Sequence, residues 1–306
     1  MRAELIMMIG TSYSGKSTYA QSAAEMIDAT IFSSDAIRKE LYGDENEQKN
    51  PGKVFDILHR RIIKHLREGG RAIYDATNLS CKRRMGFLKM LENSYIDCEK
   101  RAFVILCTPS VIKQRMEQRE RKVPWEVVHR QICQFQMPYY YEGWDDIKVI
   151  KTCDTETRFK DIHEAINTMY DFNQDNPNHA LTLDSHLKKA FDCALRYDYN
   201  KEVQHAALYH DIGKIFTKTF VNHKGETTDI AHYYGHEGWS AYYLMLIAPD
   251  VGYTLNNWIR SAVLVQWHMA HYMRTPESME TLYKMLAKSG LDEELKQLER
   301  CDKEAH

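Results

Sequence analysis

Apolar positions in the first half of the chain fall into short runs separated by polar turns. Leu5–Ile9 is apolar throughout and is followed by Gly10. Runs of this kind are typical of strands that a parallel sheet buries on both faces. Comparable strands are predicted at 30–34, 71–74, 102–107 and 147–150, and a helix at 17–26. The alternation predicts an α/β domain, a parallel sheet with flanking helices.

Apolar residues in the second half recur at helical spacing. Helices are predicted at 159–172, 183–197 and 203–210, and the polar segment 173–178 contains Pro177. At 306 residues the chain is long enough for two cores. We therefore expect a first domain at 1–152, a linker or bridging helix at 153–177 and an all-α domain at 178–306.

The segment Gly10–Ser17 fits the pattern G-x-x-x-x-G-K-[ST] at every fixed position. Glycines let backbone N–H groups converge on phosphate oxygens, Lys16 brings a cation to the β- and γ-phosphates, and Ser17 can hold Mg²⁺. The predicted helix directs its positive N-terminal end toward the same anion. ATP with Mg²⁺ is therefore the expected cofactor. Its expected ligands are Gly10, Ser14, Gly15, Lys16, Ser17, Thr18, Arg115 and Arg119.

A phosphate acceptor needs residues of its own. Asp35 and Arg38 are three apart after the strand at 30–34, so both can face one side of a helix start. The carboxylate can accept the proton of an attacking hydroxyl, and the arginine can grip an acceptor phosphate. A helix N-cap Asp with a solvated Arg is the alternative. Further acceptor-site candidates are Asp75, Asn78 and Arg83, although loop capping also explains an Asp and an Asn there.

Basic residues gather at 115–122, where Arg115, Arg119, Arg121 and Lys122 precede Pro124. Arg115 and Arg119 would share a helix face, where their repulsion favours an anion between them. A lid over ATP would supply that anion. A solvated surface helix is the alternative, because glutamates are interleaved.

These motifs, in this order, resemble the kinase domain of bacteriophage and bacterial polynucleotide 5′-kinases over roughly the first half of the chain. The resemblance implies that Asp35 is the general base, that Arg38 contacts the acceptor's phosphate and that Arg119 contacts the ATP phosphates.

Histidine is concentrated in the second half, since most of the fourteen His lie after residue 178. His186 lies on one predicted helix, and the doublet His210-Asp211 ends another, where Gly213 is placed to stop the helix. Such residues on packed helices make a plausible metal triad. For any single His, a core or surface role is the alternative.

This pattern resembles the HD phosphohydrolase superfamily, an all-helical fold, over about 175–306. The resemblance implies one or two divalent transition metals (Mn²⁺, Ni²⁺, Co²⁺ or Zn²⁺) and a phosphate-binding role for Lys214. The implied metal ligands are His186, His210, Asp211 and Asp302, with His236 and His268 for a second metal.

Composition adds few limits. Net charge is −2, hydrophobic content is 43%, and no window approaches a transmembrane span. The seven Cys include no C-x-x-C pair, which favours free thiols in a reducing cytosol. The first 150 residues carry the excess of Lys and Arg, which suits an anionic acceptor but also ATP alone. We expect a cytoplasmic protein with no membrane association.

Together these features predict a bifunctional enzyme that heals nucleic-acid ends, with RNA favoured over DNA and a ligase as a partner. It would phosphorylate 5′-hydroxyl ends and hydrolyse 3′-phosphate or 2′,3′-cyclic phosphate ends. Fused kinase–HD repair proteins place the HD domain first, whereas here it is second. Two alternatives stay open: a small-molecule (nucleoside, sugar or antibiotic) kinase fused to an HD nucleotidase, and a non-catalytic nucleotide-sensing module.

Overall fold

The computed structural model describes residues 2–119, 123–177, 179–250, 252 and 254–306. Two compact units divide the chain: the first comprises 1–107 and 138–152, and the second comprises 108–137 and 153–306. This division differs from the one expected from sequence. The segment 108–137 belongs to the second unit, and so does 153–177, which we expected to be a linker or bridging helix between the domains.

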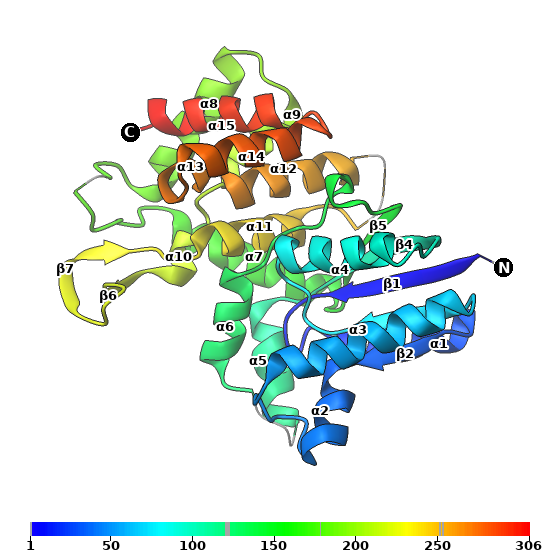
Figure 1. Ribbon diagram of the computed structural model, residues 1–306. Helices are drawn as coiled ribbons and strands as arrows, with labels where there is room; N and C mark the ends of the chain where they lie inside the picture. Colours follow the sequence, from blue (N-terminus) through cyan, green and yellow to red (C-terminus); the bar gives the residue numbers. More distant parts are fainter. Residues whose placement is uncertain (1, 120–122, 178, 251, 253) are drawn as a thin grey trace. The chain divides into compact units, whose positions relative to one another are not determined.

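The first unit is built on a five-stranded sheet in the order β2-β3-β1-β4-β5 (Figure 1). Every neighbouring pair of strands is parallel. The strands are β1 (Ala3–Ile9), β2 (Thr30–Ser33), β3 (Arg71–Asp75), β4 (Cys98–Leu106) and β5 (Asp146–Lys151). Each overlaps a predicted strand, and the central β1 is almost wholly buried. The predicted α/β architecture is confirmed, and it is typical of a P-loop kinase domain.

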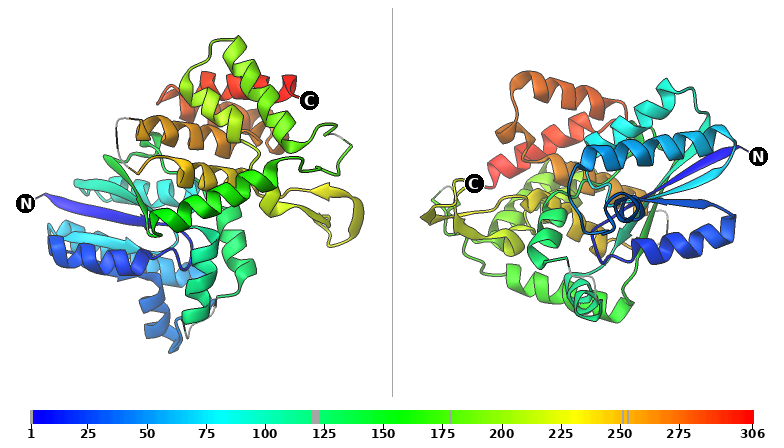
Figure 2. Two further views of the ribbon diagram at one scale, coloured as in Figure 1. Left: turned by 180° about the vertical axis from the view of Figure 1, so that it is seen from behind. Right: turned by 60° about the horizontal axis from the view of Figure 1, so that its bottom comes forward.

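Helices flank this sheet (Figures 1 and 2). They are α1 (Lys16–Ile27), α2 (Ser34–Tyr42), α3 (Pro51–Arg67) and α4 (Cys81–Asn93), with a short 3₁₀ helix at Tyr140–Glu142. Alternate residues of β1 face opposite sides of the sheet. Ile6 and Met8 therefore share one face, where they cluster with Ala20 of α1. This packing fixes α1, and with it the loop that precedes the helix.

The second unit is mainly helical. Its helices are α5 (Pro109–Gln118), α6 (Trp125–Cys133), α7 (Thr155–Met169), α8 (Leu183–Arg196), α9 (Lys201–Tyr209), α10 (Lys214–Thr217), α11 (His236–Ile247), α12 (Leu255–Trp267), α13 (Ala270–Met273), α14 (Pro276–Ala287) and α15 (Asp292–Glu304). Because α5 packs on α7 and α6 packs on α11, the segment 108–137 joins this unit. In the part of the chain that is described, no helix is both long and apolar enough to cross a membrane.

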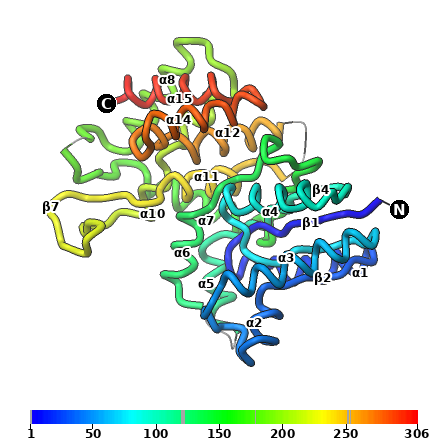
Figure 3. Tube along the Cα trace, in the orientation of Figure 1, coloured from blue at the N-terminus to red at the C-terminus, as the bar shows by residue number. Residues whose placement is uncertain are grey.

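An antiparallel hairpin interrupts the helices. It consists of β6 (Thr219–Val221) and β7 (Thr227–His232), traced in yellow in Figure 3. The expectation of an all-α second domain is therefore wrong at this segment. The turn between the strands uses Gly225 at φ +82°, a backbone conformation that glycine adopts without strain.

Candidate active sites

The phosphate-binding loop lies between β1 and α1. A Cβ on Gly10 would lie 2.4 Å from the backbone oxygen of Ile105 in β4, so only glycine fits there. Gly15 forms the N-cap of α1 at φ +94°. The backbone oxygen of the buried Ser14 accepts a hydrogen bond from the Thr152 hydroxyl. The loop is thus held from two strands before any ligand binds.

The lysine and the hydroxyl residues of the loop motif lie at the start of α1. Lys16 is buried, and its Nζ donates to the backbone oxygen of Thr11 at 2.6 Å. Ser17 and Thr18 follow in the first helical turn and are exposed. Ser17 Oγ donates to Asp75 Oδ2 at 2.8 Å. Asp75 ends β3, the strand beside β1, so the ends of the two strands bring hydroxyl and carboxylate together.

This contact changes the role expected of Asp75. We expected Asp75 in the acceptor site, but it lies against the loop hydroxyl that can hold Mg²⁺. A hydroxyl and a carboxylate in contact are oxygen ligands of the type that Mg²⁺ prefers. Ser17 and Asp75 therefore fit a Mg²⁺ site.

The remaining acceptor candidates separate in the structure. Asn78, at φ +46°, donates from Nδ2 to the backbone oxygen of Met8 at 2.9 Å, so it braces the loop after β3. Arg83 is exposed on α4. Its neighbour Arg84 is fully buried and pairs with Glu142, with Nη2 and Oε1 2.6 Å apart. Arg84 Nη1 also donates to the backbone oxygen of Asn78 at 3.0 Å. The sequence analysis named only Arg83 on this helix and missed this role of Arg84.

Asp35 and Arg38 do meet on one side of α2. Arg38 Nη1 lies 2.8 Å from Asp35 Oδ1 and donates to Ser34 Oγ at 3.2 Å. The N-cap is Ser33, whose side chain accepts from the Asp35 amide, and Arg38 is buried. The alternative, an Asp cap with a solvated Arg, therefore does not describe this helix. The half-exposed Asp35 carboxylate stays accessible beside a fixed guanidinium.

The two lid arginines lie in the second unit. Arg115 is on α5, but the helix ends at Gln118, and Arg119 is extended at φ −95° and ψ 140°. The expectation that Arg115 and Arg119 share one helix face is therefore wrong. Arg121 and Lys122, which we also placed in the lid, lie outside the described residues.

A second candidate site lies among the helices of the second unit. It contains all six residues predicted as metal ligands, and each of them is buried. They are His186 of α8, His210 and Asp211 after α9, His236 at the start of α11, His268 after α12, and Asp302 of α15. Five separate segments thus converge on one point.

Asp211 is the centre of this cluster. Its Oδ2 lies 3.5 Å from His186 Nε2 and 3.6 Å from His210 Nε2. Its other oxygen, Oδ1, lies 3.0 Å from His236 Nε2 and 3.4 Å from His268 Nε2. Asp302 Oδ1 completes the first group, 3.2 Å from His186 Nε2. Each oxygen of Asp211 therefore faces its own pair of histidines.

Three of these histidines have their Nδ1 atoms at backbone oxygens, an orientation typical of histidine metal ligands. The Nδ1 atoms of His210, His236 and His268 each lie 2.6–3.0 Å from the backbone oxygen of the residue three positions earlier. A neutral imidazole that donates from Nδ1 carries its lone pair on Nε2. His236 Nε2 and His268 Nε2 are only 3.2 Å apart, so two lone pairs and a carboxylate oxygen face one another. A cation between them would remove that repulsion.

Two further observations fit metal ions at these positions. Among the described residues, Asp211 Oδ1 is a buried oxygen with no hydrogen-bond partner. The donor set is imidazole and carboxylate, which suits Mn²⁺, Fe²⁺, Co²⁺, Ni²⁺ and Zn²⁺. The residues present therefore fit a pair of divalent metals that share Asp211.

Lys214 holds the Asp211 carboxylate. Its Nζ lies 2.6 Å from Asp211 Oδ2 and donates to Gln174 Oε1 at 2.8 Å. Burial would raise the pKa of Asp211, but the Lys214 ammonium holds it well below its usual range. The pKa of Asp302 is also lowered, although burial by itself would raise it. Both carboxylates are thus anionic and ready to bind cations.

Two histidines beside this cluster were missed by the sequence analysis. His306 Nε2 lies 3.6 Å from Asp302 Oδ1, and its ring centroid is 4.9 Å from that of His186. His179 Nε2 lies 3.5 Å from Lys214 Nζ. Burial lowers the pKa of His179 to about 4, so this ring is neutral at pH 7. The only signal was their presence in the histidine-rich half, because neither occurs in a recognisable motif.

Residues 5–139 match the model of a family described as an AAA domain. Among curated proteins, none matches the chain. Among solved structures, a putative kinase from Chloroflexus aurantiacus is 14% identical, with a TM-score of 0.41, over 55% of this chain and 97% of that one. A gluconokinase from Sinorhizobium meliloti is 17% identical, with a TM-score of 0.36, over 54% and 90%.

A fungal RNA kinase is 12% identical, with a TM-score of 0.39, over 64% of this chain and 45% of that one. Likeness at this level does not identify a substrate. The family match, the loop geometry and the parallel sheet agree on a coarser conclusion: the first unit is a P-loop domain, and its sheet with flanking helices is typical of a P-loop kinase domain.

Proposed function

We propose that this protein heals nucleic-acid ends with two separate active sites, and that RNA is the favoured substrate. One site transfers the γ-phosphate of ATP to a 5′-hydroxyl. The other hydrolyses a 3′-phosphate or a 2′,3′-cyclic phosphate, as in HD phosphohydrolases. The products, a 5′-phosphate and a 3′-hydroxyl, are the ends that a ligase partner joins. One observation carries the proposal: each of the two carboxylate oxygens of Asp211 faces its own pair of histidines. The same chain also contains a P-loop.

The kinase role is supported by the acceptor-side pair. Asp35 would take the proton of the attacking hydroxyl, a role supported by its half-exposed carboxylate, which Arg38 orients. Arg38 would hold a phosphate next to that hydroxyl. Ser17 and Asp75 would hold Mg²⁺, and Lys16 would neutralise charge on the transferred group. A nucleotide switch needs no acceptor base, so Asp35 favours an enzyme over a sensing module.

The phosphohydrolase role is supported by the ligand arrangement. His186, His210, Asp211 and Asp302 would hold one metal, and Asp211, His236 and His268 would hold the other. Such metals activate water at neutral pH and stabilise charge on a phosphate. Lys214 keeps Asp211 ionised and in place, and the backbone oxygens that contact Nδ1 keep the Nε2 lone pairs of His210, His236 and His268 directed inward.

The test offers the purified protein 5′-hydroxyl RNA, 5′-hydroxyl DNA and free nucleosides with labelled ATP, and 3′-phosphate ends with Mn²⁺, Ni²⁺, Co²⁺ or Zn²⁺. We expect transfer to oligonucleotides and release of phosphate from their 3′ ends. Asp35→Asn should lose only transfer, and Asp211→Asn should lose only hydrolysis, so each variant is the control for the other. Phosphorylation of nucleosides but not of oligonucleotides would establish the small-molecule alternative.

A further inference from the structure

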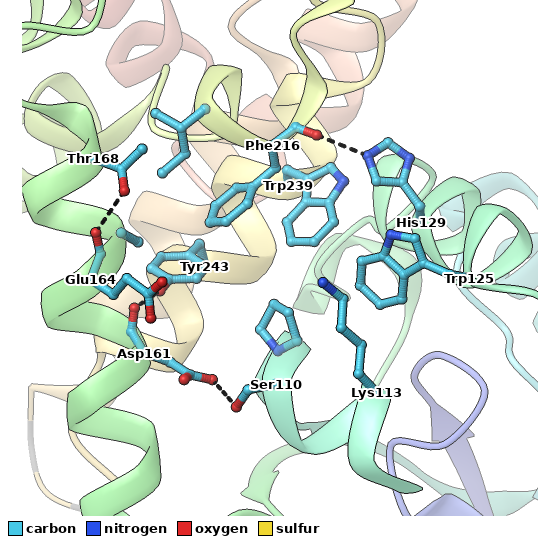
Figure 4. A pocket seen from close by; sticks show the side chains of 13 residues that line it. Ser110, Lys113, Trp125, His129, Asp161, Glu164, Thr168, Phe216, Trp239 and Tyr243 are labelled. Atoms are coloured by element: carbon cyan, nitrogen blue, oxygen red, sulfur yellow. Dashed lines mark hydrogen bonds between the residues drawn. The ribbon is translucent and has the colours of Figure 1, made fainter. Parts of the chain in front are cut away.

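A pocket of about 390 Å³ lies within the second unit, and none of the site residues assigned above lines it (Figure 4). Five helices form it: α5, α6, α7, α10 and α11. One side is aromatic and the other carries carboxylates. We call it the aromatic pocket and define it by Trp125, Phe216, Trp239, Tyr243, Asp161 and Glu164. Its volume lies at the lower end of the range for small-molecule sites.

The aromatic side is preformed. Phe216 and Trp239 stack with ring centroids 4.5 Å apart and planes at 20°. His129 holds this pair from the edge, since its Nε2 lies 3.0 Å from the backbone oxygen of Phe216. Tyr243 is fixed by a hydrogen bond from its hydroxyl to the backbone oxygen of Asp161 at 2.6 Å. Rings fixed in this way offer a flat surface on which a planar group can stack.

The opposite side accepts hydrogen bonds. Asp161 and Glu164 are three residues apart on α7 and line the pocket together. Ser110 already donates to Asp161 Oδ2. Glu164 is exposed at the pocket edge. Lys113 lines the rim and places its Nζ 4.7 Å from the centre of the Trp125 ring. A ligand must therefore be planar, must donate N–H groups on one edge and is helped by a negative charge near Lys113.

The geometry points to a nucleobase site that prefers guanine. Guanine stacks on aromatic rings and presents a ring N–H and an exocyclic amine side by side, which one carboxylate can accept together. Uracil presents a single N–H between two carbonyl oxygens, which a carboxylate repels. The phosphate attached to a nucleotide would suit Lys113. The ligand is either a free guanine nucleotide or an unpaired guanine near a strand end.

The pocket shares two helices with the histidine cluster. Phe216 and Lys214 both lie on α10, and Trp239 and His236 both lie on α11. A base held by Phe216 and Trp239 would therefore be anchored to the helices that carry the cluster. That the guanine belongs to a strand end rests on the proposed function, whereas the preference of the pocket for guanine does not.

The first experiment measures quenching of tryptophan fluorescence, because two pocket rings are tryptophans. Guanosine and uridine are the probes, since neither carries a phosphate for the other sites. We expect guanosine to bind at least tenfold more tightly than uridine. Glu164→Gln should remove this preference, because it replaces an acceptor oxygen by a donor amide, whereas Glu156→Gln, exposed on α7 outside the pocket, should not. Equal binding of the two nucleosides, no binding, or an unchanged preference in Glu164→Gln would overturn the proposal.

The second experiment separates the two sources of the base. The KM for 3′-phosphate oligonucleotides is compared between strands that end in unpaired guanines and strands that end in uracils. A lower KM for guanine that is lost in Glu164→Gln assigns the pocket to strand ends. Equal KM values with tight guanosine binding assign it to a free nucleotide. If the wild-type protein hydrolyses neither kind of 3′-phosphate end but still binds guanosine, the proposed function is refuted and the guanine site is retained.

Discussion

Gly213 passes so close to the start of α11 that a Cβ on it would lie 2.2 Å from the backbone oxygen of His236. Its φ of −63° is ordinary, so the expected role of this glycine as a helix stop is wrong. Its amide donates to Ser240 Oγ at 2.8 Å. The absence of a side chain at 213 is therefore what brings Asp211 within reach of His236.

Gly213→Ala should disrupt the histidine cluster. The added methyl must push the turn that carries His210 and Asp211 away from α11, because a backbone oxygen cannot give way as a flexible side chain does. We expect a loss of bound metal, measured by elemental analysis, and a fall in the melting temperature. Gly86→Ala is the control: it lies in helix α4 with open space around it, and should be stabilising by up to about 1 kcal/mol. Wild-type metal content in Gly213→Ala would contradict the close-packing argument.

Ligand variants should reveal two metal positions that share Asp211. His268→Ala removes a neighbour of Asp211 Oδ1 only, so we expect the loss of about one metal equivalent per chain. Asp211→Asn affects both positions, and we expect nearly complete loss. His205→Ala, which alters a half-buried histidine that stacks on Trp258 and is not one of the six ligands, is the matched control. Equal metal content in His268→Ala and the wild type would mean that the site is mononuclear or that His268 is structural.

Asp75→Asn should weaken the response of the kinase site to magnesium. The amide keeps the size of the side chain and can still contact Ser17, but it no longer offers a charged oxygen to Mg²⁺. We expect kcat to fall by at least tenfold at low Mg²⁺ and to recover partly as Mg²⁺ is raised. Titration of transfer activity against Mg²⁺ measures this. If transfer activity depends on the Mg²⁺ concentration in the same way in Asp75→Asn and the wild type, Asp75 is not a Mg²⁺ ligand, and its assignment as an acceptor-site residue is favoured again.

His59 should make the first unit sensitive to mild acid. The ring stacks on Phe87 at 4.5 Å, and burial lowers its pKa to about 4 from an ordinary value near 6.5. Between pH 6.5 and about pH 4, His59 is therefore protonated in the unfolded chain but not in the folded one. The free energy of unfolding falls over this range as the pH is lowered. The shift corresponds to about 3 kcal/mol.

His59→Phe tests this by urea unfolding at pH 7.5 and pH 4.5. The phenylalanine keeps a stacked ring but cannot be protonated, so the variant should lose less stability between the two pH values than the wild type does. His223→Phe, an exposed histidine of the hairpin turn, should behave like the wild type. An equal loss in wild type and His59→Phe would place the acid sensitivity elsewhere.

The sequence was sufficient where function depends on a few consecutive residues. The loop between Gly10 and Ser17 is such a case, because its glycines and its lysine act through the local backbone. The strands were predictable for a similar reason: burial on both faces demands continuous apolar runs. The six candidate metal ligands were named from a family pattern, and the fold brings them together from five segments.

Tertiary packing decided everything that joins distant segments. Arg84 pairs with Glu142, 58 residues away, and a charge pattern alone could not distinguish it from the exposed Arg83. The placement of α5 and α6 in the second unit depends on α7 and α11, and the need for a glycine at 213 depends on His236. A sequence motif records the geometry of a few neighbouring residues, whereas partners across the fold are selected by how complete surfaces pack.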